Sequence, residues 1–438
     1  MIINSNVITI ALFLTTSVLA LPSSSSLIIT HNDKKVVIEN SLITLPFARR
    51  LNTTRLRGGN LLKNDLARAK HFKTRTATRK SKEGLEKRKT SALSAAIGVP
   101  ATNQAVDYVL TVGVGSPVTN YSLLVDTGSS NTWVGAHTLY RRTSTSAATV
   151  NAVFVEYGSG FFFGQEFTDR VTLAPGLVIE DQSIGVTTPA SAFGFDGVDG
   201  IIGIGPQDLT CGTLTPQVDE CIPTVTDNAF SQNLISSDLV GISFQPATST
   251  SDTNGELTFG GTDSSKFTGD ITFVPITSTS PASEFVGLDQ SITYGSANTP
   301  ILATTAGIMD TGTTLLMIAT DAFQAYQTAT GAVPDSNTGL LTVTADQFAA
   351  LESLFFTIGD TTFEFTPNAQ LWPRALNTAI GGTTDGLYLI VNDIGSASGE
   401  GLDFIDGMAF LERFYTVYDT AGSRFGIATT SFTDAETN

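Results

Sequence analysis

The chain has 438 residues, enough for two or three domains of ordinary size, and a formal net charge of −17. Residues 21–89 hold 17 of the 24 Lys and Arg but 5 of the 41 Asp and Glu, so this segment carries +12 and the remainder −29. A body this acidic would repel phosphate, which excludes nucleic acid as the expected partner. The basic arm is either a solvated tail or, the reading we favour, a propeptide held on an acidic partner within the same precursor.

The N-terminus is apolar and uncharged. Residues 7–20, VITIALFLTTSVLA, end in small side chains and predict a signal peptide over residues 1–20, cut near Ala20. No later stretch is apolar over the roughly 18 residues that a membrane span needs. A secreted, extracellular protein without a membrane anchor is therefore expected.

The basic arm, residues 21–90, is predicted to be a propeptide. It contains the dibasic pair Lys87-Arg88, so we expect cleavage near Arg88 or slightly later. Apolar and basic residues alternate in the arm, so it can pack against the body as well as neutralise it.

The region after residue 91 is predicted to be mostly β. The segment 108–115, YVLTVGVG, places Tyr108, Leu110, Val112 and Val114 on one face of a strand. The pattern of segment 255–276 predicts strands separated by turns. Helices are expected over 224–235, 320–331 and 344–356. The last begins with a capping box formed by Thr344 and Gln347. Its apolar face would consist of Phe348, Leu351 and Phe355.

One short phrase occurs twice. Asp126-Thr127-Gly128-Ser129 recurs as Asp310-Thr311-Gly312-Thr313, and aliphatic residues precede both copies. Each copy is followed by a later apolar, Gly-containing segment, 198–205 and 402–411. The repeat predicts two related lobes, 91–267 and 268–438, arranged as a pseudo-twofold pair with a cleft between them.

Two such turns facing each other have a defined chemistry. Gly leaves an exposed N–H near each carboxylate, and the hydroxyl side chains can hold both carboxyls in one plane. Two carboxyls about 3 Å apart cannot both ionise, so they share one proton. The ionised group can then take a proton from a water while the other donates to an amide carbonyl, and the titration belongs to the pair.

The sequence resembles the pepsin family of aspartic endopeptidases and, within it, the acid proteases of basidiomycete fungi. The resemblance covers nearly all of the region after about residue 100. It rests on DTGSSNTWVG, YGSG, GFDGVDGIIGIGP, IPTVTDNAFSQ, NGELTFGGTDSSKFTG, AGIMDTGTT and FLERFYTVYD. It implies a bilobal double-β-barrel fold and an acid endopeptidase.

The resemblance also implies roles for residues in and around the two turns. Asp126 and Asp310 would be the catalytic pair. The supporting residues would be Thr127, Gly128, Ser129, Thr311, Gly312 and Thr313, with the threonines after each Asp buttressing the turns and Ser129 and Thr313 bonding the outer carboxyl oxygens.

The segment 156–160, EYGSG, resembles the flap that closes over substrate. Tyr157 would pack on the substrate and bond the indole N–H of Trp133, and Gly158 and Ser159 would bind the substrate backbone. The resemblance implies large hydrophobic residues around the cleaved bond. Cleavage after Lys should be poor, because relatives that accept Lys tend to have an acidic residue in place of Ser159.

The same resemblance implies which partners and cofactors to expect. The expected partners are protein or peptide substrates and the chain's own propeptide as an intramolecular inhibitor, with no metal and no cofactor, and a monomer is expected. In relatives a propeptide lysine pairs with the catalytic carboxylates, for which Lys70 and Lys73 are the candidates here.

Some features lie outside the catalytic motifs. Cys211 and Cys221 are the two cysteines, and secretion predicts that they form a disulfide. The sequon at Asn120 is a candidate glycosylation site, expected on a turn between two strands. The family's apolar-apolar-Gly-Asp phrase in the second lobe is replaced here by Ile405-Asp406-Gly407-Met408, so its Asp has moved or been replaced.

Other hydrolase classes fit poorly. One histidine, His137, follows residue 89, and no GxSxG phrase and no His cluster are present. The remaining alternative is a catalytically silent pepsin-like protein that binds or inhibits a partner. Because such relatives usually lose an Asp or the flap Tyr, the retention of Asp126, Asp310 and Tyr157 favours the enzyme.

Overall fold

The computed structural model describes residues 26–31, 34–39, 43–51, 60–83, 106–158, 160–247 and 251–436. The predicted signal peptide, the Lys87-Arg88 pair and Ser159 lie outside these residues. The chain divides into two units, Met1–Ser41 and Leu42–Asn438. In the first, β1 (Ser26–His31) pairs antiparallel with β2 (Lys34–Glu39).

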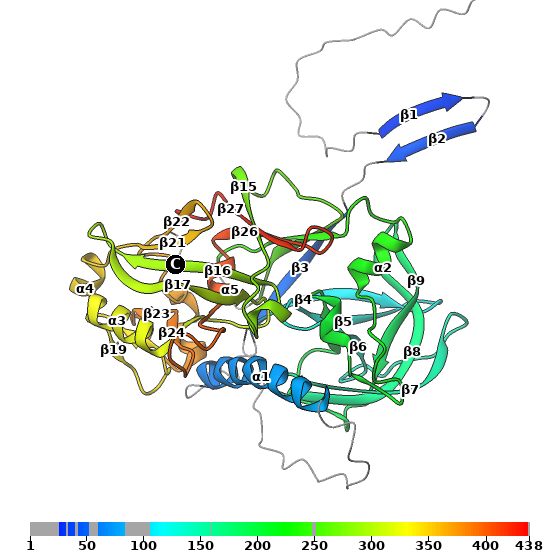
Figure 1. Ribbon diagram of the computed structural model, residues 1–438, viewed down its shortest axis with the longest axis horizontal. Coiled ribbons are helices and arrows are strands. Elements are labelled where there is room, and N and C mark those ends of the chain that lie inside the picture. Colours follow the sequence, from blue (N-terminus) through cyan, green and yellow to red (C-terminus); the bar gives the residue numbers. More distant parts are fainter. Residues whose placement is uncertain are drawn as a thin grey trace, which may run out of the picture. The chain divides into compact units, whose positions relative to one another are not determined.

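The second unit is mostly β, as predicted (Figure 1). Six of its strands close a barrel, because each pairs with the next and the last returns to the first. In ring order they are β4 (Val106–Val114), β5 (Thr119–Asp126), β11 (Gly200–Gly203), β6 (Thr132–Val134), β9 (Leu177–Val186) and β8 (Phe161–Ala174). The predicted apolar face of β4 is buried in the core.

Further strands extend this barrel on both sides. On one side they are β7 (Ala147–Glu156), β10 (Ala192–Phe193) and β12 (Leu214–Thr215). On the other they are β3 (Ile43–Leu51), β14 (Ser251–Phe259), β13 (Leu239–Ser243), β26 (Phe414–Asp419), β27 (Arg424–Thr429) and β15 (Thr268–Pro275). One sheet thus joins early and late parts of the chain. The lobe boundary predicted near residue 267 falls between β14 and β15 and stays a prediction.

A second sheet has seven strands in an open row. In order they are β22 (Thr361–Phe365), β21 (Leu354–Ile358), β16 (Gly287–Tyr294), β17 (Thr299–Met309), β25 (Phe404–Asp406), β18 (Leu316–Ile318) and β24 (Val391–Asp393). A small third sheet contains β19 (Val333–Pro334), β20 (Leu341–Thr342) and β23 (Tyr388–Leu389).

The two large sheets repeat one local arrangement. In the barrel, β11 lies parallel to β5, with Ile202 opposite Val125. In the second sheet, β25 lies parallel to β17, with Asp406 opposite Met309. Both inserted strands also pair antiparallel with the strand that follows the turn, β6 or β18. The two copies of the repeated phrase therefore leave equivalent strands.

The predicted helices exist but differ in length. They are α2 (Val225–Ser231), α3 (Thr320–Thr330) and α4 (Ala345–Ala349), and α5 (Met408–Leu411) is a further short one. The capping box at Thr344 and Gln347 is confirmed. The extension of that helix to residue 356 is wrong, because the aromatic run at 354–358 pairs as β21 with β16 and β22 instead.

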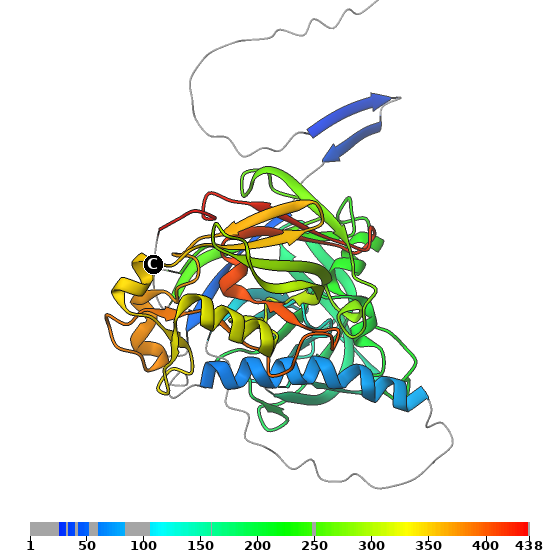
Figure 2. The same ribbon diagram turned by 60° about the vertical axis from the view of Figure 1, so that its left-hand side comes forward.

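The basic arm contributes two elements to the second unit. The helix α1 (Asn60–Glu83) lies across one side of the strands in both views (Figures 1 and 2). The strand β3 is inserted between β14 and β4. Of the described helices, none has both the length and the apolar composition needed to cross a membrane.

The strand β3 contributes directly to the hydrophobic core. Phe47 is 2% exposed, and its ring lies edge-on to Tyr108 at 5.1 Å and to Phe244 at 5.4 Å between centroids. A Cβ added at Gly255 would lie 2.5 Å from the Phe47 ring, so glycine there makes room for it. The arm is therefore a structural part of the full-length fold.

We expect Phe47→Ala to lower the free energy of unfolding of the full-length chain by about 3–5 kcal/mol, because it leaves a cavity among aromatic rings. Chemical denaturation followed by circular dichroism would measure this loss. Phe230→Ala is the control, since Phe230 is 42% exposed on α2. Equal losses in the two variants would contradict a core role for β3.

Candidate active site

The two repeated turns meet at the ends of β5 and β17. Asp126 and Asp310 are both 0% exposed. The backbone N–H of Asp310 donates to the carbonyl of Asp406 at 3.2 Å, and the N–H of Ile204 donates to the carbonyl of Asp126 at 2.9 Å. Backbone hydrogen bonds to β25 and to the residue after β11 thus hold Asp310 and Asp126 in place.

The threonines after each Asp bind the opposite turn. The N–H of Thr127 donates to Oγ1 of Thr311 at 3.0 Å, and the N–H of Thr311 donates to Oγ1 of Thr127 at 3.0 Å. The Thr311 hydroxyl also donates to the carbonyl of Val125 at 3.0 Å. These reciprocal bonds lock the two turns together.

Both carboxyls receive the same donors from their own turn. Asp126 accepts from the N–H of Gly128 at 3.1 Å and from the hydroxyl of Ser129 at 2.5 Å. Asp310 likewise accepts from the N–H of Gly312 at 3.1 Å and from the hydroxyl of Thr313 at 2.5 Å. The sequence-based expectation for the donor residues matches this geometry.

The two glycines allow the carboxyls to approach each other. A Cβ built on Gly128 would lie 2.7 Å from Oδ1 of Asp310, and one on Gly312 would lie 2.7 Å from Oδ1 of Asp126. Any side chain at either position would collide with the carboxyl of the opposite turn. This is the physical reason for glycine at the third position of the phrase.

A single guanidinium from α1 bridges the two carboxyls. Arg68 Nε donates to Oδ2 of Asp310 at 2.5 Å, and Nη2 donates to Oδ1 of Asp310 at 2.9 Å and to Oδ1 of Asp126. Arg68 is 2% exposed, so the ion pairs are shielded from water. A buried cation between two buried carboxyls is stable only because each compensates the other.

The pKa values of these groups are shifted in opposite directions. Burial raises the pKa of Asp126 above its ordinary value, although Arg68 opposes this. Burial also acts on Asp310, but the charge and the hydrogen bonds of Arg68 outweigh it and hold the pKa of Asp310 below its ordinary value. Burial opposes the charge of Arg68, whose pKa is nevertheless raised by the two carboxylates.

The prediction that Lys70 or Lys73 faces the carboxyls is wrong. Lys70 is exposed, and Lys73 Nζ binds Ser396 and Glu400 instead. Because an α-helix turns by about 100° per residue, a side chain two positions after Arg68 points away from the turns. The helix itself was missed, although its buried positions 61, 65, 68, 69 and 72 have helical spacing.

Other residues of α1 also bind around the turns. Both carboxyl oxygens of Asp65 accept backbone N–H groups, from Thr314 at 3.2 Å and from Leu315 at 2.9 Å. Burial raises the pKa of Asp65 to about 7, against the effect of these donors. The ring of Phe72 packs edge-on to Phe285 at 4.8 Å between centroids.

His71 is another titratable group of α1 at this interface. Burial lowers the pKa of His71 to about 3, and the charges of Arg75 and Arg68 act in the same direction. A Cβ added at Gly158 would lie 2.9 Å from Cβ of His71. His71 is therefore held neutral beside the hairpin β7–β8.

The hairpin formed by β7 and β8 ends at Tyr157 and Gly158. The N–H of Tyr157 donates to the carbonyl of Gly160 at 2.8 Å, and Gly158 has a φ of +74°, a conformation that favours glycine. A Cβ at Gly158 would also lie 2.5 Å from the carbonyl oxygen of Ala67. The hairpin tip thus lies directly against the backbone of α1.

Tyr157 and Trp133 make the contact that the resemblance implied. The indole N–H of Trp133 donates to the Tyr157 hydroxyl at 2.9 Å, and both side chains are buried. The Trp133 ring stacks on Phe162 at 4.4 Å and lies edge-on to Phe195 at 4.9 Å between centroids. An aromatic cluster therefore anchors the hairpin beside Asp126.

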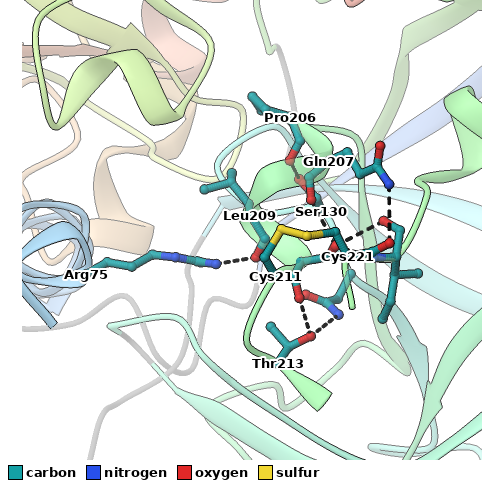
Figure 3. The surroundings of a disulfide bond; sticks show 11 residues. Arg75, Ser130, Pro206, Gln207, Leu209, Cys211, Thr213 and Cys221 are labelled. Atoms are coloured by element: carbon teal, nitrogen blue, oxygen red, sulfur yellow. Dashed lines mark hydrogen bonds between the residues drawn. A yellow bond between two sulfur atoms is a disulfide. The ribbon is translucent and has the colours of Figure 1, made fainter. Parts of the chain in front are cut away.

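Cys211 and Cys221 form the predicted disulfide, and Figure 3 shows what surrounds it. The hydroxyl of Ser130 donates to the carbonyl of Pro206 at 2.6 Å, so the loop that holds the disulfide is tied to the first turn. Arg75 of α1 donates to the carbonyl of Leu209 in the same loop. Sequence reasoning had no role for Ser130, whose partner lies 76 positions away.

Two polar residues lie apart from this site. Asn120 is exposed but belongs to β5, so its expected place on a turn is wrong; the turn is formed by residues 115–118. His137 is also exposed. Within the described segments, no three His, Cys, Asp or Glu side chains gather closely enough to hold a metal ion.

Comparison with known proteins identifies the class to which this site belongs. A profile described as eukaryotic aspartyl protease matches residues 107–430. Polyporopepsin from Irpex lacteus is 65% identical over 344 residues, covering 78% of this chain and 100% of that protein. Rhizopuspepsin-1 from Rhizopus niveus is 31% identical over 312 residues, covering 68% and 76%. The crystal structure of the aspartic proteinase from Irpex lacteus superposes with a TM-score of 0.76 and 55% identity, covering 91% of this chain and all of that one.

The chain therefore belongs to the eukaryotic aspartyl protease family and is a peptide hydrolase. The resemblance to the pepsin family drawn from the motifs is confirmed, and so is the bilobal, mostly β fold.

Tyr157→Phe should lower the free energy of unfolding by about 1–3 kcal/mol, because it leaves the buried indole N–H of Trp133 unpaired. Urea denaturation measures the loss. In a Trp133→Phe background the same change should cost clearly less, since no donor is left unpaired. The same cost in both backgrounds would show that the hydrogen bond is not the cause.

Proposed function

We propose that this chain is a secreted acid endopeptidase that is made as a latent precursor and cleaves peptide bonds through Asp126 and Asp310. The observation that carries the proposal is that one guanidinium bonds both buried carboxyls at once. Two carboxyls close enough to share Arg68 are close enough to share a proton and a water once Arg68 has left. Each carboxyl has the same two donors on its own turn, which supports a water that binds both carboxyls in the same way.

The proposed reaction needs one proton on the pair. Without Arg68, two buried carboxyls at this separation cannot both remain charged, so one is protonated. The ionised carboxyl takes a proton from a bound water, whose oxygen attacks the carbonyl carbon of the peptide. The protonated carboxyl donates to the carbonyl oxygen, and the C–N bond then breaks as the nitrogen receives a proton. The pair titrates as a unit, so acid and base are not assigned to single residues.

A preference for large hydrophobic residues around the cleaved bond is part of the proposal. In this structure Phe72 of α1 occupies the neighbourhood of the turns: its ring would lie 2.8 Å from a Cβ on Gly128 and packs on Phe285. An aromatic side chain thus already fits beside the carboxyls. The hairpin β7–β8 can add the substrate as an extended strand and close over it.

Asp126→Asn should abolish hydrolysis of denatured haemoglobin or casein at about pH 3 to 4, because the amide cannot take a proton from water. The assay uses acid-processed protein with and without pepstatin, and pepstatin should block the unsubstituted enzyme. Asp385→Asn, which removes an exposed carboxyl, is the control and should stay active. Silence of the unsubstituted processed form, with Asp126→Asn behaving identically, would favour the binding or inhibitor protein instead.

We propose further that the basic arm is the inhibitor, with α1 as the element that blocks the site. Arg68 neutralises the carboxyls, and α1 also touches the hairpin tip and the second turn through Ala67 and Asp65. The positive arm and the negative body attract each other near neutral pH. Protonation of carboxylates weakens this attraction in acid, where we expect conversion of the precursor.

Two groups of α1 respond to acid in opposite directions. His71 has a docked pKa of about 3, below its ordinary 6.5, so release of α1 takes up a proton between these values and acid weakens docking. Asp65 has a docked pKa of about 7, above its ordinary 3.8, so acid strengthens docking between those values. Arg68 stays charged throughout.

His71→Asn should therefore shift precursor conversion to lower pH, because the amide takes up no proton on release. Asp65→Asn should shift it much less through titration, because near pH 3 to 4 Asp65 is largely protonated both docked and released. Each proton changes the docking equilibrium by about tenfold per pH unit inside its window. Electrophoresis of the precursor after brief incubation at stepped pH measures the midpoint. A shift of His71→Asn to higher pH, or no shift in this variant, would contradict this account of release.

A further inference from the structure

A carboxyl lies in the core of the second sheet at a position where the first lobe has an aliphatic side chain. Asp406 is opposite Met309 in the same way that Ile202 is opposite Val125. Asp406 is 1% exposed. No step of the proposed peptide hydrolysis uses it, and in the sequence it marks the departure from the family's usual phrase.

One side-chain amide lies next to the Asp406 carboxyl. Gln290, on β16, is 0% exposed, and its Nε2 donates to Oδ1 of Asp406 at 3.1 Å. Among the described residues, Oδ2 of Asp406 and Oε1 of Gln290 have no hydrogen-bond partner. The two orphaned oxygens thus belong to the two side chains that already share a bond.

These two oxygens cannot both be acceptors without cost. A buried carboxylate with one donor and no cation is strongly disfavoured. A neutral carboxylic acid has an O–H donor, and the Gln290 Oε1 is the acceptor that lacks one. Burial raises the pKa of Asp406 to about 8, and the Gln290 amide opposes this only in part.

Other ionisable residues lie on the elements packed around Asp406 but do not change this conclusion. They are Asp289 and Tyr294 on β16, Asp310 after β17, Asp403 before β25, and Glu412 and Arg413 after α5. Burial and the Gln290 amide are the causes that act on the Asp406 pKa. No cation among the described residues forms an ion pair with this carboxyl.

Segment 406–409 is bonded to the turn that carries Asp310. The N–H of Asp310 donates to the carbonyl of Asp406 at 3.2 Å, that of Met408 to Thr313 at 2.8 Å, and that of Ala409 to Thr314 at 3.0 Å. A shift of Asp406 relative to β16 would therefore move the Asp310 turn. Gln290 lies on β16, beyond β17 as seen from β25, and its hydrogen bond is the side-chain link from β16 to Asp406.

We propose that Asp406 is held as a neutral carboxylic acid in a reciprocal two-bond pair with the Gln290 amide, and that this pair is a positioning device for Asp310. Nε2–H of Gln290 donates to Oδ1, and Oδ2–H of Asp406 donates to Oε1 of Gln290. The positioning role rests on the proposed function of Asp310. The protonation state of the pair does not.

The pair makes the enzyme sensitive to alkali. Since the folded pKa of Asp406 is about 8 and its ordinary value is 3.8, the group favours the folded state below 3.8 and loses that contribution as the pH rises through about 8. Ionisation removes the O–H donor and leaves a charge facing Oε1 of Gln290. The second turn should then loosen before the first.

The test compares Asp406→Asn with Asp385→Asn in the full-length chain. The amide introduced by Asp406→Asn can make both hydrogen bonds but does not ionise, so the unfolding equilibrium of this variant should not change with pH through this group. The unsubstituted chain and Asp385→Asn should become less stable by up to about tenfold per pH unit between the ordinary and the folded pKa of Asp406. Urea denaturation at stepped pH from 5 to 9.5 measures this. An alkaline loss in Asp406→Asn equal to that of the control, or a failure of Asp406→Asn to fold at pH 5, would overturn the proposal.

Infrared spectroscopy of the unsubstituted chain tests the protonation state directly. At pH 6 the C=O stretch of buried carboxylic acids should include a band that disappears with a midpoint near 8 and that is missing from Asp406→Asn, whereas the band of Asp65, which ionises near 7, should remain in both. A spectrum without such a band would refute the neutral acid. Neither readout needs catalysis, so both stand even where the haemoglobin assay fails.

The positioning role is tested with Gln290→Leu in the processed enzyme at pH 4. It should lower kcat by about tenfold or more, because a misplaced catalytic group is costly. KM should stay constant because Gln290 is buried away from substrate. Unchanged kcat would overturn the positioning role.

Discussion

Burial of two like-charged groups side by side is the constraint on which the rest of the structure depends. Asp126 and Asp310 are both inaccessible to water, and an uncompensated pair of carboxylates there would cost a free energy comparable to the whole stability of a protein. Each therefore receives an N–H and a hydroxyl from its own turn. The close approach of the carboxyls requires a glycine two positions after each Asp, and the hydroxyl donors require a Ser or Thr three positions after it, so burial of the pair explains most of the repeated phrase.

The compensation has a fixed part and a removable part. The donors of the two turns belong to the folded body, whereas the positive charge comes from Arg68 on α1. While Arg68 is present both carboxyls can be ionised, and without it a proton must replace the lost charge. Under the proposed function, latency and catalysis are thus two solutions of the same electrostatic problem, differing only in which cation neutralises the pair.

The sequence predicts those parts of the site that are local. Asp126, Gly128 and Ser129 lie within one turn, so their spacing shows their chemistry, and the repeat supplies the second turn. Arg68 could not be found this way, because its contact with Asp310 spans 242 positions of sequence and depends on how α1 docks. The basic arm also contains many similar cations. The helix at 344–356 was predicted too long because an amphipathic pattern outweighed the strand preference of its aromatic residues. The joint sheet escaped prediction because β3, β13 and β26 pair across distant parts of the chain.

The two turns bind their carboxyls through the same donors, but different residues support them on the side away from the carboxyls. The Ser130 hydroxyl ties the first to the carbonyl of Pro206, which precedes the Cys211–Cys221 disulfide, and neither group of this bond titrates. Behind the second turn lies Asp406, whose amide partner is 116 positions away in sequence. A pseudo-twofold repeat keeps the geometry that faces substrate, because both carboxyls must be equivalent there. It places no such demand on the supporting layer, and each lobe can therefore lose its half of the site under different conditions. The hydrogen bond behind the first turn does not titrate, whereas the buried acid behind the second does, so alkali would loosen the second half of the site first.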